Sequence, residues 1–239
     1  MTGGASGLGR ATSRELARLG AHVLIADIDL EGAATTLRQI QESSVGGSAE
    51  VVELDVTDPR RVDQVIGEAS ASHGQRFDCL VNNAGTDRAS DLVDVDDVQW
   101  HAVFAVNVHG PMYLSRAFVR HVRARGSRPG RPADIVCVVS ISALTVGAGA
   151  GAYNASKAAL LKFTEVMQTE ARERAWPVRV SAINPAAMKT PMMDQWGLPD
   201  ERMMPPEVVA GIIGTAVTLP PEVVLQSAVV TMRNEVFPR

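Results

Sequence analysis

Tyr153 and Lys157 are the two residues whose types and spacing point most directly to chemistry. They lie four positions apart in the segment AYNASKAALLKFTEVM, whose pattern predicts a helix. Residues i and i+4 share one helix face, so the phenol and the ammonium can address the same space. A neighbouring cation stabilises phenolate. We therefore expect Lys157 to lower the pKa of Tyr153, which would make the phenol usable as a general acid/base.

Ser140 adds a hydroxyl to this pair, because it ends the apolar run DIVCVVS. Such a run is typical of a buried strand, and open α/β sheets bind their ligands at the carboxyl ends of the strands. A hydroxyl at that place can hold a substrate oxygen while its charge changes. A serine that caps a turn is the alternative interpretation, and Ser142 is a second candidate for the same role.

The glycine-rich segment 2–9, TGGASGLG, opens directly into a helix-like stretch. Glycines permit a tight turn and a close backbone approach to a pyrophosphate at a helix N-terminus. Taken alone, the segment is equally typical of an ordinary turn. Its context favours a dinucleotide site, because the next apolar run (22–26) ends at Asp27, where a carboxylate can bind an adenosine ribose.

The carboxylate of Asp27 also bears on the choice of cofactor. It would repel a 2′-phosphate, and no Arg or Lys stands directly beside it in the sequence. The sequence therefore favours NAD over NADP. An N-cap of the following helix is the alternative role for either Asp27 or Asp29.

The elements that must position these residues alternate along the chain. Short apolar runs predict strands, and amphipathic stretches between them predict helices. Strict alternation favours parallel strands joined by right-handed crossovers, which is an α/β, Rossmann-like doubly wound sheet in a single domain, 1–239. The expected strands are 22–26, 50–54, 77–81, 134–140, 177–183 and 227–232, and the expected helices are 8–19, 30–42, 59–72, 97–125, 152–175 and 206–218.

Composition excludes several classes of protein. The formal net charge is −4 and the arginines are scattered, which argues against a nucleic-acid partner. No apolar run is long enough to cross a bilayer and no signal peptide is evident, so we expect a cytoplasmic protein without a membrane partner. Cys79 and Cys137 lie in apolar runs and are expected to be core thiols. The five histidines are dispersed without metal-ligand spacing, so no metal is expected.

Four separated motifs resemble those of the short-chain dehydrogenases/reductases. Segment 2–9 resembles the family's TGxxxGxG cofactor loop, and 82–85 resembles its NNAG segment. The third motif is a catalytic serine followed thirteen residues later by YxxxK, and the fourth is the asparagine that completes the family's tetrad. The residues that match these last two motifs are Asn107, Ser140, Tyr153 and Lys157.

The resemblance implies an oxidoreductase that transfers a hydride between NAD and an alcohol or carbonyl substrate. Tyr153 would exchange a proton with the substrate oxygen, and Ser140 would orient that oxygen. Lys157 would hold the nicotinamide ribose, while Asn107 would support a water that links the lysine to solvent. The cofactor contacts that it implies are Gly3, Ser6, Gly7, Leu8, Gly9, Asp27, Asp55, Val56, Asn83, Ala84, Gly85, Tyr153, Lys157, Pro185 and Thr190.

The start of the chain departs from the family's pattern. Family members carry an apolar first strand at the centre of the sheet, and here only Met1 precedes Thr2. Without that strand, backbone groups on two neighbouring strands would lack partners, at about 1 kcal/mol or more for each group. We therefore expect the natural protein to start several residues upstream.

Residues 186–206 correspond to the family's substrate-covering loop. The four methionines and the tryptophan of PMMDQWGLPDERMMPP favour a hydrophobic alcohol or ketone as substrate. Packing of these methionines against the protein itself is an equal alternative. Ala186 replaces a glycine of the family's pattern and is expected to stiffen this loop slightly.

Two other functions on the same fold remain open. One is a dinucleotide-binding sensor or scaffold without turnover, and the other is a dehydratase or epimerase. The complete set of four catalytic-type residues favours an enzyme. The resemblance also implies a homodimer or homotetramer that uses the helices at 97–125 and 152–175. The tail SAVVTMRNEVFPR lacks the family's GG-containing ending, which removes the usual basis for a tetramer.

Overall fold

The computed structural model describes residues 1–43 and 46–234, and in this part of the chain the expected strands are confirmed. Each pairing between them is parallel, as the alternation of strands and helices predicts. The strands are β1 (His22–Asp27), β2 (Ser48–Glu53), β3 (Cys79–Asn82), β4 (Ala133–Val138), β5 (Val178–Pro185) and β6 (Ser227–Val230).

The helices also agree with the sequence. The segment expected as helix over 97–125 is helical throughout, and a π-helical turn at Ala105–His109 lies between its two α-helical parts. A π turn inserts one extra residue into a helix and often marks a functional position. The helices are α1 (Gly7–Arg18), α2 (Leu30–Glu42), α3 (Pro59–His73), α4 (Asp97–Phe104), α5 (Gly110–Arg125), α6 (Gly151–Glu173) and α7 (Pro206–Thr218).

Aspartates fix where several helices begin. Asp29, Asp58 and Asp96 are the N-caps of α2, α3 and α4, and each carboxylate accepts a backbone hydrogen bond from the first turn. Such caps satisfy amide groups that have no carbonyl one turn earlier. Asp29 therefore takes the N-cap role that the sequence left open between Asp27 and Asp29.

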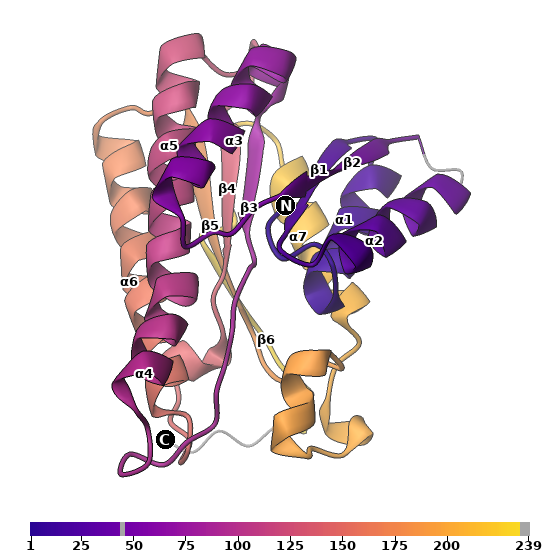
Figure 1. Ribbon diagram of the computed structural model, residues 1–239. Coiled ribbons are helices and arrows are strands. Elements are labelled where there is room, and N and C mark those ends of the chain that lie inside the picture. Colours follow the sequence, from indigo (N-terminus) through magenta and orange to yellow (C-terminus); the bar gives the residue numbers. More distant parts are fainter. Residues whose placement is uncertain (44–45, 235–239) are drawn as a thin grey trace.

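In the described residues, the strands form two sheets. β1 pairs with β2, and β3-β4-β5-β6 form the second sheet. Met1 and Thr2 lie between them: the amide of Ala26 donates to the carbonyl of Met1 (2.9 Å), and the amide of Thr2 donates to the carbonyl of Val81 (3.1 Å). These two residues supply part of the pairing expected of a central strand, and they join the sheets at the point marked N in Figure 1.

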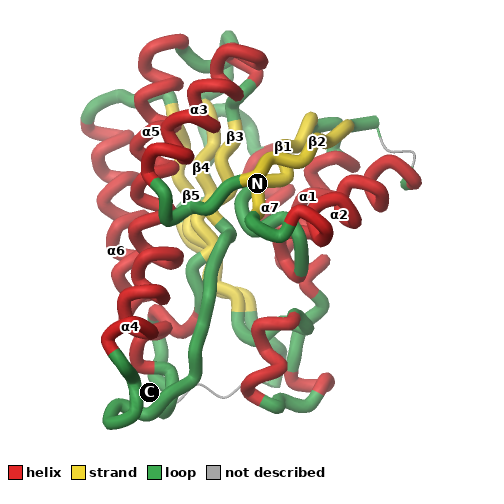
Figure 2. Tube along the Cα trace, in the orientation of Figure 1, coloured by secondary structure: helices red, strands yellow, loops and turns green. Residues whose placement is uncertain are grey.

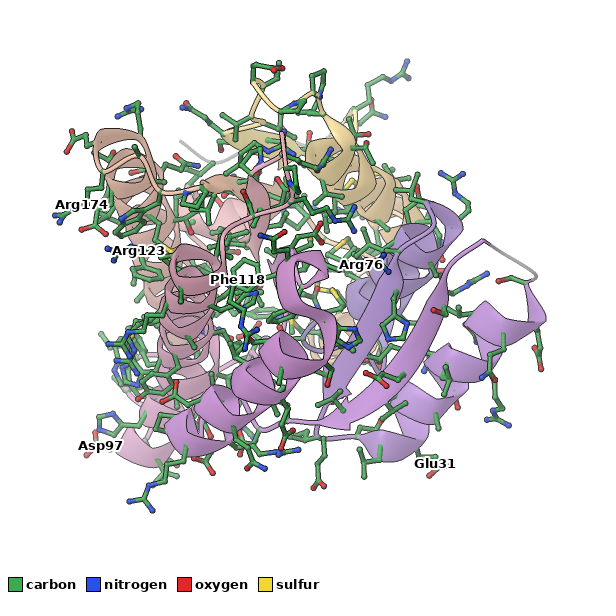
Figure 3. All side chains as sticks on the ribbon, turned by 90° about the horizontal axis from the view of Figure 1, so that it is seen from above. Glu31, Arg76, Asp97, Phe118, Arg123 and Arg174 are labelled. Carbon is green, nitrogen blue, oxygen red and sulfur yellow. The ribbon has the colours of Figure 1, made fainter. Side chains whose placement is uncertain are left out.

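Helices cover both faces of the larger sheet, as Figures 1 and 2 show. Along β4, Ile135 and Cys137 belong to the hydrophobic cluster formed with α3, α5 and α6, whereas Val136 and Val138 belong to the cluster formed with α1 and α7. This alternation follows from the two-residue period of a strand. In Figure 3 Phe118, which is fully buried, lies inside, while Glu31 and Arg174 lie at the periphery.

The cysteines and the lengths of the helices bear on two further expectations. Cys79 and Cys137 are free thiols within the hydrophobic clusters, as expected. In the described part of the chain, no helix is both long and apolar enough to span a membrane.

Candidate active site

A cavity of about 710 Å³ lies at the carboxyl ends of the strands. Its walls are the glycine-rich segment and the loops that follow β1 through β5, which is where doubly wound sheets bind ligands. Nearly all predicted site residues line this cavity, except Gly9 and Asn107. Those that do are Gly3, Ser6, Gly7, Leu8, Asp27, Asp55, Val56, Asn83, Ala84, Gly85, Ser140, Tyr153, Lys157, Pro185 and Thr190.

Thr2 anchors the glycine-rich segment to the end of β3. Its hydroxyl donates to the carbonyl of Val81 (3.2 Å) and accepts from the amides of Asn83 (3.0 Å) and Ala84 (3.1 Å). The side-chain amide of Asn83 in turn donates to the carbonyl oxygens of Thr2 (2.9 Å) and Gly3 (3.2 Å). These bonds hold the turn and the segment 82–85 against each other.

Two glycines of this segment have no room for a side chain. Gly7 has φ +48°, and a Cβ added there would lie 3.0 Å from Cγ2 of Thr190, which also lines the cavity. A Cβ on Gly9 would lie only 1.7 Å from the carbonyl oxygen of Gly3. α1 begins at Gly7, and Ser6, Gly7 and Leu8 line the cavity. The positive end of the helix dipole therefore faces the cavity.

The carboxylate of Asp27 is held at the end of β1. It accepts hydrogen bonds from the amides of Ala5 (2.9 Å) and Asp29 (3.0 Å) while lining the cavity. Arg10, which directly follows the glycine-rich segment, comes near Ala5 in space, although no arginine stands beside Asp27 in the sequence. Arg10 donates to the carbonyl of Ala5 and to the hydroxyl of Thr36 (3.2 Å), so its guanidinium is bound to the protein and does not line the cavity.

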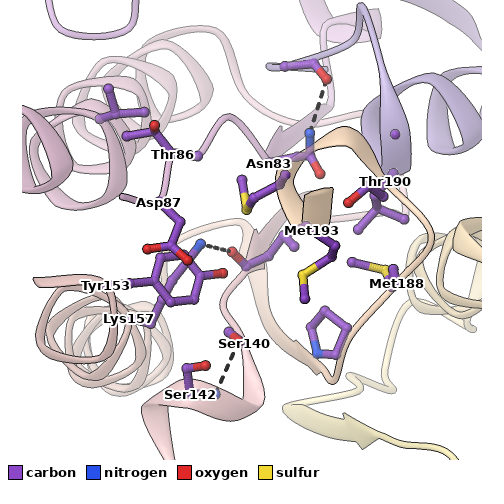
Figure 4. Close-up of a pocket in the computed structure, with 18 of the residues that line it drawn as sticks. Asn83, Thr86, Asp87, Ser140, Ser142, Tyr153, Lys157, Met188, Thr190 and Met193 are labelled. Carbon is purple, nitrogen blue, oxygen red and sulfur yellow. Dashed lines mark hydrogen bonds between the residues drawn. The ribbon is translucent and has the colours of Figure 1, made fainter. Parts of the chain in front are cut away.

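Ser140, Tyr153 and Lys157 converge on the other half of the cavity (Figure 4). Ser140 caps the short helix that follows β4, and its hydroxyl oxygen accepts from the amide of Ser142 (3.1 Å). The same hydroxyl lowers the pKa of Tyr153. Ser140 therefore has the capping role that the sequence left open, while its side chain also lines the cavity.

The pKa of Tyr153 differs from the expectation. Burial of the phenol raises its pKa to about 12; the hydrogen bond from Ser140 lowers it, and the Asp87 carboxylate raises it further. The expected lowering by Lys157 is wrong for the cofactor-free protein. The lysine Nζ lies 5.6 Å from the centre of the phenol ring and donates to the carbonyl of Val138 (3.0 Å). Burial outweighs a cation at that distance.

Burial also disfavours the charged form of Lys157. It is 3% exposed, and burial lowers its pKa to about 8, although the nearby Cys137 and Asp87 favour the charged form. A buried ammonium loses the hydration it would have in water, and one hydrogen bond to a carbonyl does not replace it. With a pKa of about 8, the side chain of Lys157 can gain or lose a proton at neutral to mildly alkaline pH.

Asn107 lies in the π-helical turn, behind the cavity wall. Its side-chain amide donates to the carbonyl of Thr86 (2.9 Å) and to the hydroxyl of Ser156 (3.0 Å), and its oxygen accepts from the amide of Thr86 (2.9 Å). A Cβ on Gly85 would lie 3.4 Å from Oδ1 of Asn107 and 3.6 Å from Nζ of Lys157. The asparagine thus fixes the loop that separates it from the lysine.

Asp87 is a site residue that the sequence analysis missed. Figure 4 shows it beside Tyr153 and Lys157, and its carboxylate influences the pKa of both. One oxygen accepts from the indole Nε1 of Trp196 (2.9 Å). Its other oxygen, Oδ1, is buried and has no hydrogen-bond partner among the described residues. Its place two residues after the NNAG segment was the available signal.

The segment expected to cover the substrate forms the wall opposite Tyr153. Met188 and Met193 lie there in Figure 4, and Met192 and Trp196 also line the cavity. Met204, in contrast, is 3% exposed and packs within the cluster around α1 and α7. The two alternatives for the methionines thus apply to different residues. Ala186 is buried without a positive φ, so alanine fits there without backbone strain.

Known proteins resemble this chain over most of its length. Residues 1–200 match the family model described as short chain dehydrogenase. The chain is 35% identical over 222 residues to 1-deoxy-11-beta-hydroxypentalenate dehydrogenase of Streptomyces exfoliatus, which covers 90% of this chain and 78% of that protein. It is 33% identical over 202 residues to a cyclopentanol dehydrogenase of a Comamonas species, which covers 82% and 74%.

A solved structure agrees with these sequence relatives. A metagenomic short-chain oxidoreductase in complex with NADP is similar to this chain with a TM-score of 0.80 and 27% identity. The likeness covers 96% of this chain and 93% of that one. The Rossmann-like arrangement of the described strands and helices is therefore shared across nearly the full length.

Proposed function

The chain belongs to the short-chain dehydrogenase/reductase family, and from this membership we propose that it transfers a hydride between NAD and a hydrophobic secondary alcohol or the corresponding ketone. Among its relatives are dehydrogenases that act on alcohols. The observation that carries the proposal is the convergence of Ser140, Tyr153 and Lys157 on one cavity with the glycine-rich turn. Binding of a dinucleotide and proton transfer can then occur side by side.

The residues around the turn fit a dinucleotide. The backbone amides at the start of α1 suit a pyrophosphate, because Ser6, Gly7 and Leu8 line the cavity there. Leu8, Asp55 and Val56 would contact the adenosine half. Thr190 and Pro185 would contact the nicotinamide half. When bound, the nicotinamide would supply the hydride acceptor that alcohol oxidation requires.

Asp27 supports NAD as the preferred form. Its carboxylate lines the cavity with both oxygens oriented by backbone amides, which suits hydrogen bonds from ribose hydroxyls and opposes a phosphate. The solved relative contains NADP, so family membership alone does not select NAD. Arg10, which follows the glycine-rich segment, is already bound to Ala5 and Thr36.

Tyr153 is the proposed general acid/base. In the cofactor-free protein its raised pKa keeps the phenol protonated near neutral pH, which is the form that donates a proton to a ketone oxygen. Oxidation of an alcohol requires phenolate instead. We therefore expect the oxidation rate to rise with pH. Ser140, whose hydroxyl lowers the pKa of the phenol, would orient the substrate oxygen beside it.

Lys157 and Asn107 would complete the proton path. With its pKa lowered to about 8, the lysine can take up or release a proton at neutral to mildly alkaline pH. Nζ of Lys157 would bind the nicotinamide ribose, which would bring the positive charge of the lysine closer to the phenol of Tyr153. The side chain of Asn107 binds Thr86 and Ser156, and it would thereby position the loop after β3. Asn107 would also support a water behind the lysine.

The covering loop indicates the substrate class. Met188, Met192, Met193 and Trp196 give the cavity an apolar wall that can adapt to a carbon skeleton. Two relatives are named for alcohols on ring systems, and one of these is cyclopentanol. We propose an alicyclic secondary alcohol. Self-association through α5 and α6 is also proposed from family membership, and light scattering after gel filtration would test it.

Turnover tests the proposed function directly. The protein is assayed with NAD+ and NADP+ in parallel against cyclopentanol, larger alicyclic alcohols and straight-chain alcohols, at the nicotinamide absorbance band. The proposal expects NADH formation with the alicyclic alcohols, and NAD+ as the better substrate. NADH binding without turnover on any alcohol would support a sensor or scaffold instead. Substrate conversion without net NADH would support a dehydratase or epimerase.

A further inference from the structure

Three potential metal ligands meet at the end of β1 that lies away from the cavity. His22 is the first residue of β1, Glu50 lies in β2, and His73 is the last residue of α3. Nε2 of His22 and Nε2 of His73 each lie 3.7 Å from Oε1 of Glu50. One ligand atom from each residue lies within 4.8 Å of the other two. Their sequence separations gave no signal, because the residues come from three different elements.

The imidazole rings of His22 and His73 are oriented so that one ion could contact both. Nδ1 of His22 lies 2.7 Å from the hydroxyl of Ser48, which leaves Nε2 directed toward Glu50. The two imidazole rings lie 5.2 Å apart between centroids, with a tilt of 38°. A second-shell hydrogen bond to the other ring nitrogen is what orients metal-binding histidines in proteins. Ser48 would have that role here.

The charge of this cluster suits a divalent cation, because Glu50 places a carboxylate between the two rings. His73 also ends α3, a helix of 15 residues, and the negative end of a helix dipole favours a cation.

We propose that His22, Glu50 and His73 bind Zn²⁺, with water in the fourth position. Two imidazole nitrogens and one carboxylate oxygen suit zinc rather than magnesium or calcium, which prefer oxygen ligands. Zinc bonds of about 2.0–2.2 Å place tetrahedral ligands about 3.3–3.5 Å apart. The separations of 3.7 Å need only a small contraction, whereas the two imidazole nitrogens, which lie within 4.8 Å of each other, approach by at most roughly 1.5 Å. The side chains are 39%, 53% and 29% exposed, so they can move by that amount.

The position of the site assigns it a structural effect. His22 and Asp27 stand at opposite ends of β1, about 16 Å apart for a strand of this length, so the zinc would lie away from the cavity. His22 and Glu50 belong to the two-stranded sheet, whereas α3 packs with α5 over the larger sheet. A zinc ion would therefore link the two-stranded sheet to α3, which packs on the larger sheet. This inference does not rest on the proposed function.

Calorimetric titration of the chelator-treated full chain with ZnCl2 tests the site. The expected result is one zinc per chain and a thermal midpoint that rises with zinc. Ser48→Ala should weaken binding about 10–100-fold, as loss of a second-shell partner does. Glu50→Gln and His73→Gln should weaken it further.

The matched control is His101→Gln, because His101 is an exposed histidine on α4 outside the cluster. It should bind zinc with unchanged affinity. The site is contradicted if the unsubstituted chain binds no zinc. It is equally contradicted if His101→Gln loses as much affinity as His73→Gln, or if Glu50→Gln loses none. Dehydrogenase activity is not the readout, so a failed turnover assay would leave this test intact.

Discussion

The indole of Trp196 donates a 2.9 Å hydrogen bond to the carboxylate of Asp87, across 109 residues of sequence. Gln195 strengthens this link, since its side chain accepts from the amide of Ala89 (3.1 Å) and donates to the carbonyl of Asp87 (3.4 Å). The apolar covering loop is thereby fastened to the loop after β3. Because Asp87 also lies beside Tyr153 and Lys157, closure of the cavity and the charge around the phenol depend on the same side chain.

Trp196→Phe should weaken substrate binding more than catalysis. The variant keeps an aromatic ring in the cavity wall but removes the bond to a charged acceptor, which is worth about 1.5–3 kcal/mol. We expect the KM for the alcohol to rise roughly tenfold or more, with kcat changed less. Steady-state kinetics would measure this. Trp100→Phe is the control, because Trp100 stacks on Phe104 and does not line the cavity. Equal KM values for both variants would contradict the fastening role.

Asp87→Asn should move the pH profile of alcohol oxidation toward lower pH. The carboxylate raises the pKa of Tyr153, so its removal lowers that pKa and increases the phenolate fraction at a given pH. The amide oxygen can still accept from Trp196, which preserves the loop contact. The test is the pH dependence of kcat/KM for oxidation. A rising limb that stays in place, or moves to higher pH, would show that Asp87 does not act on the phenol.

Lys157→Met should stabilise the fold while abolishing turnover. Burial lowers the lysine pKa from its ordinary 10.5 to about 8, so below pH 8 the native state carries a charge it disfavours. The unsubstituted protein should therefore gain stability as pH rises from about 8 to 10.5, where the unfolded chain binds more protons.

The methionine variant lacks this penalty, and its advantage in free energy of unfolding should reach up to roughly 3 kcal/mol below pH 8 and shrink above it. Urea denaturation of both proteins between pH 7 and about 10 would measure the difference. A variant less stable than the parent at pH 7 would mean that the bond to Val138 outweighs the cost of burial.

Asp27→Asn should reduce the preference for NAD. The neutral side chain loses charge-assisted hydrogen bonds to the ribose, and we expect the KM for NAD+ to rise about 10–100-fold, while NADP+ is less strongly opposed. Glu31→Gln is the matched control, because it removes a nearby negative charge in the first turn of α2 without lining the cavity. An unchanged ratio of kcat/KM for the two cofactors would remove Asp27 from the specificity argument.

The elements of the fold could be predicted because their signals are local. β-branched runs separated by amphipathic stretches located each strand within about three residues. The π-helical turn at Ala105–His109 could not be predicted this way, since it accompanies the contacts of Asn107 with Thr86 and Ser156. Neither partner is close to Asn107 in sequence.

The candidate site was predictable as a set of residues but not in its electrostatics. The spacing of Tyr153 and Lys157 correctly placed both on one cavity. It could not reveal that burial would raise the phenol pKa, because burial depends on the loops that close over the site. The bond of Asp87 to Trp196 could not be predicted either, because contacts between loops carry no periodic signal.

Tyr153→Phe, assayed for both cofactor binding and turnover, tests the central claim most directly. The variant keeps the ring and removes only the hydroxyl that exchanges the proton. We predict that NADH binding, measured by fluorescence, stays within a few-fold of the parent, while kcat for alcohol oxidation falls about 10²–10⁴-fold. Turnover within tenfold of the parent, with binding intact, would contradict Tyr153 as the general acid/base.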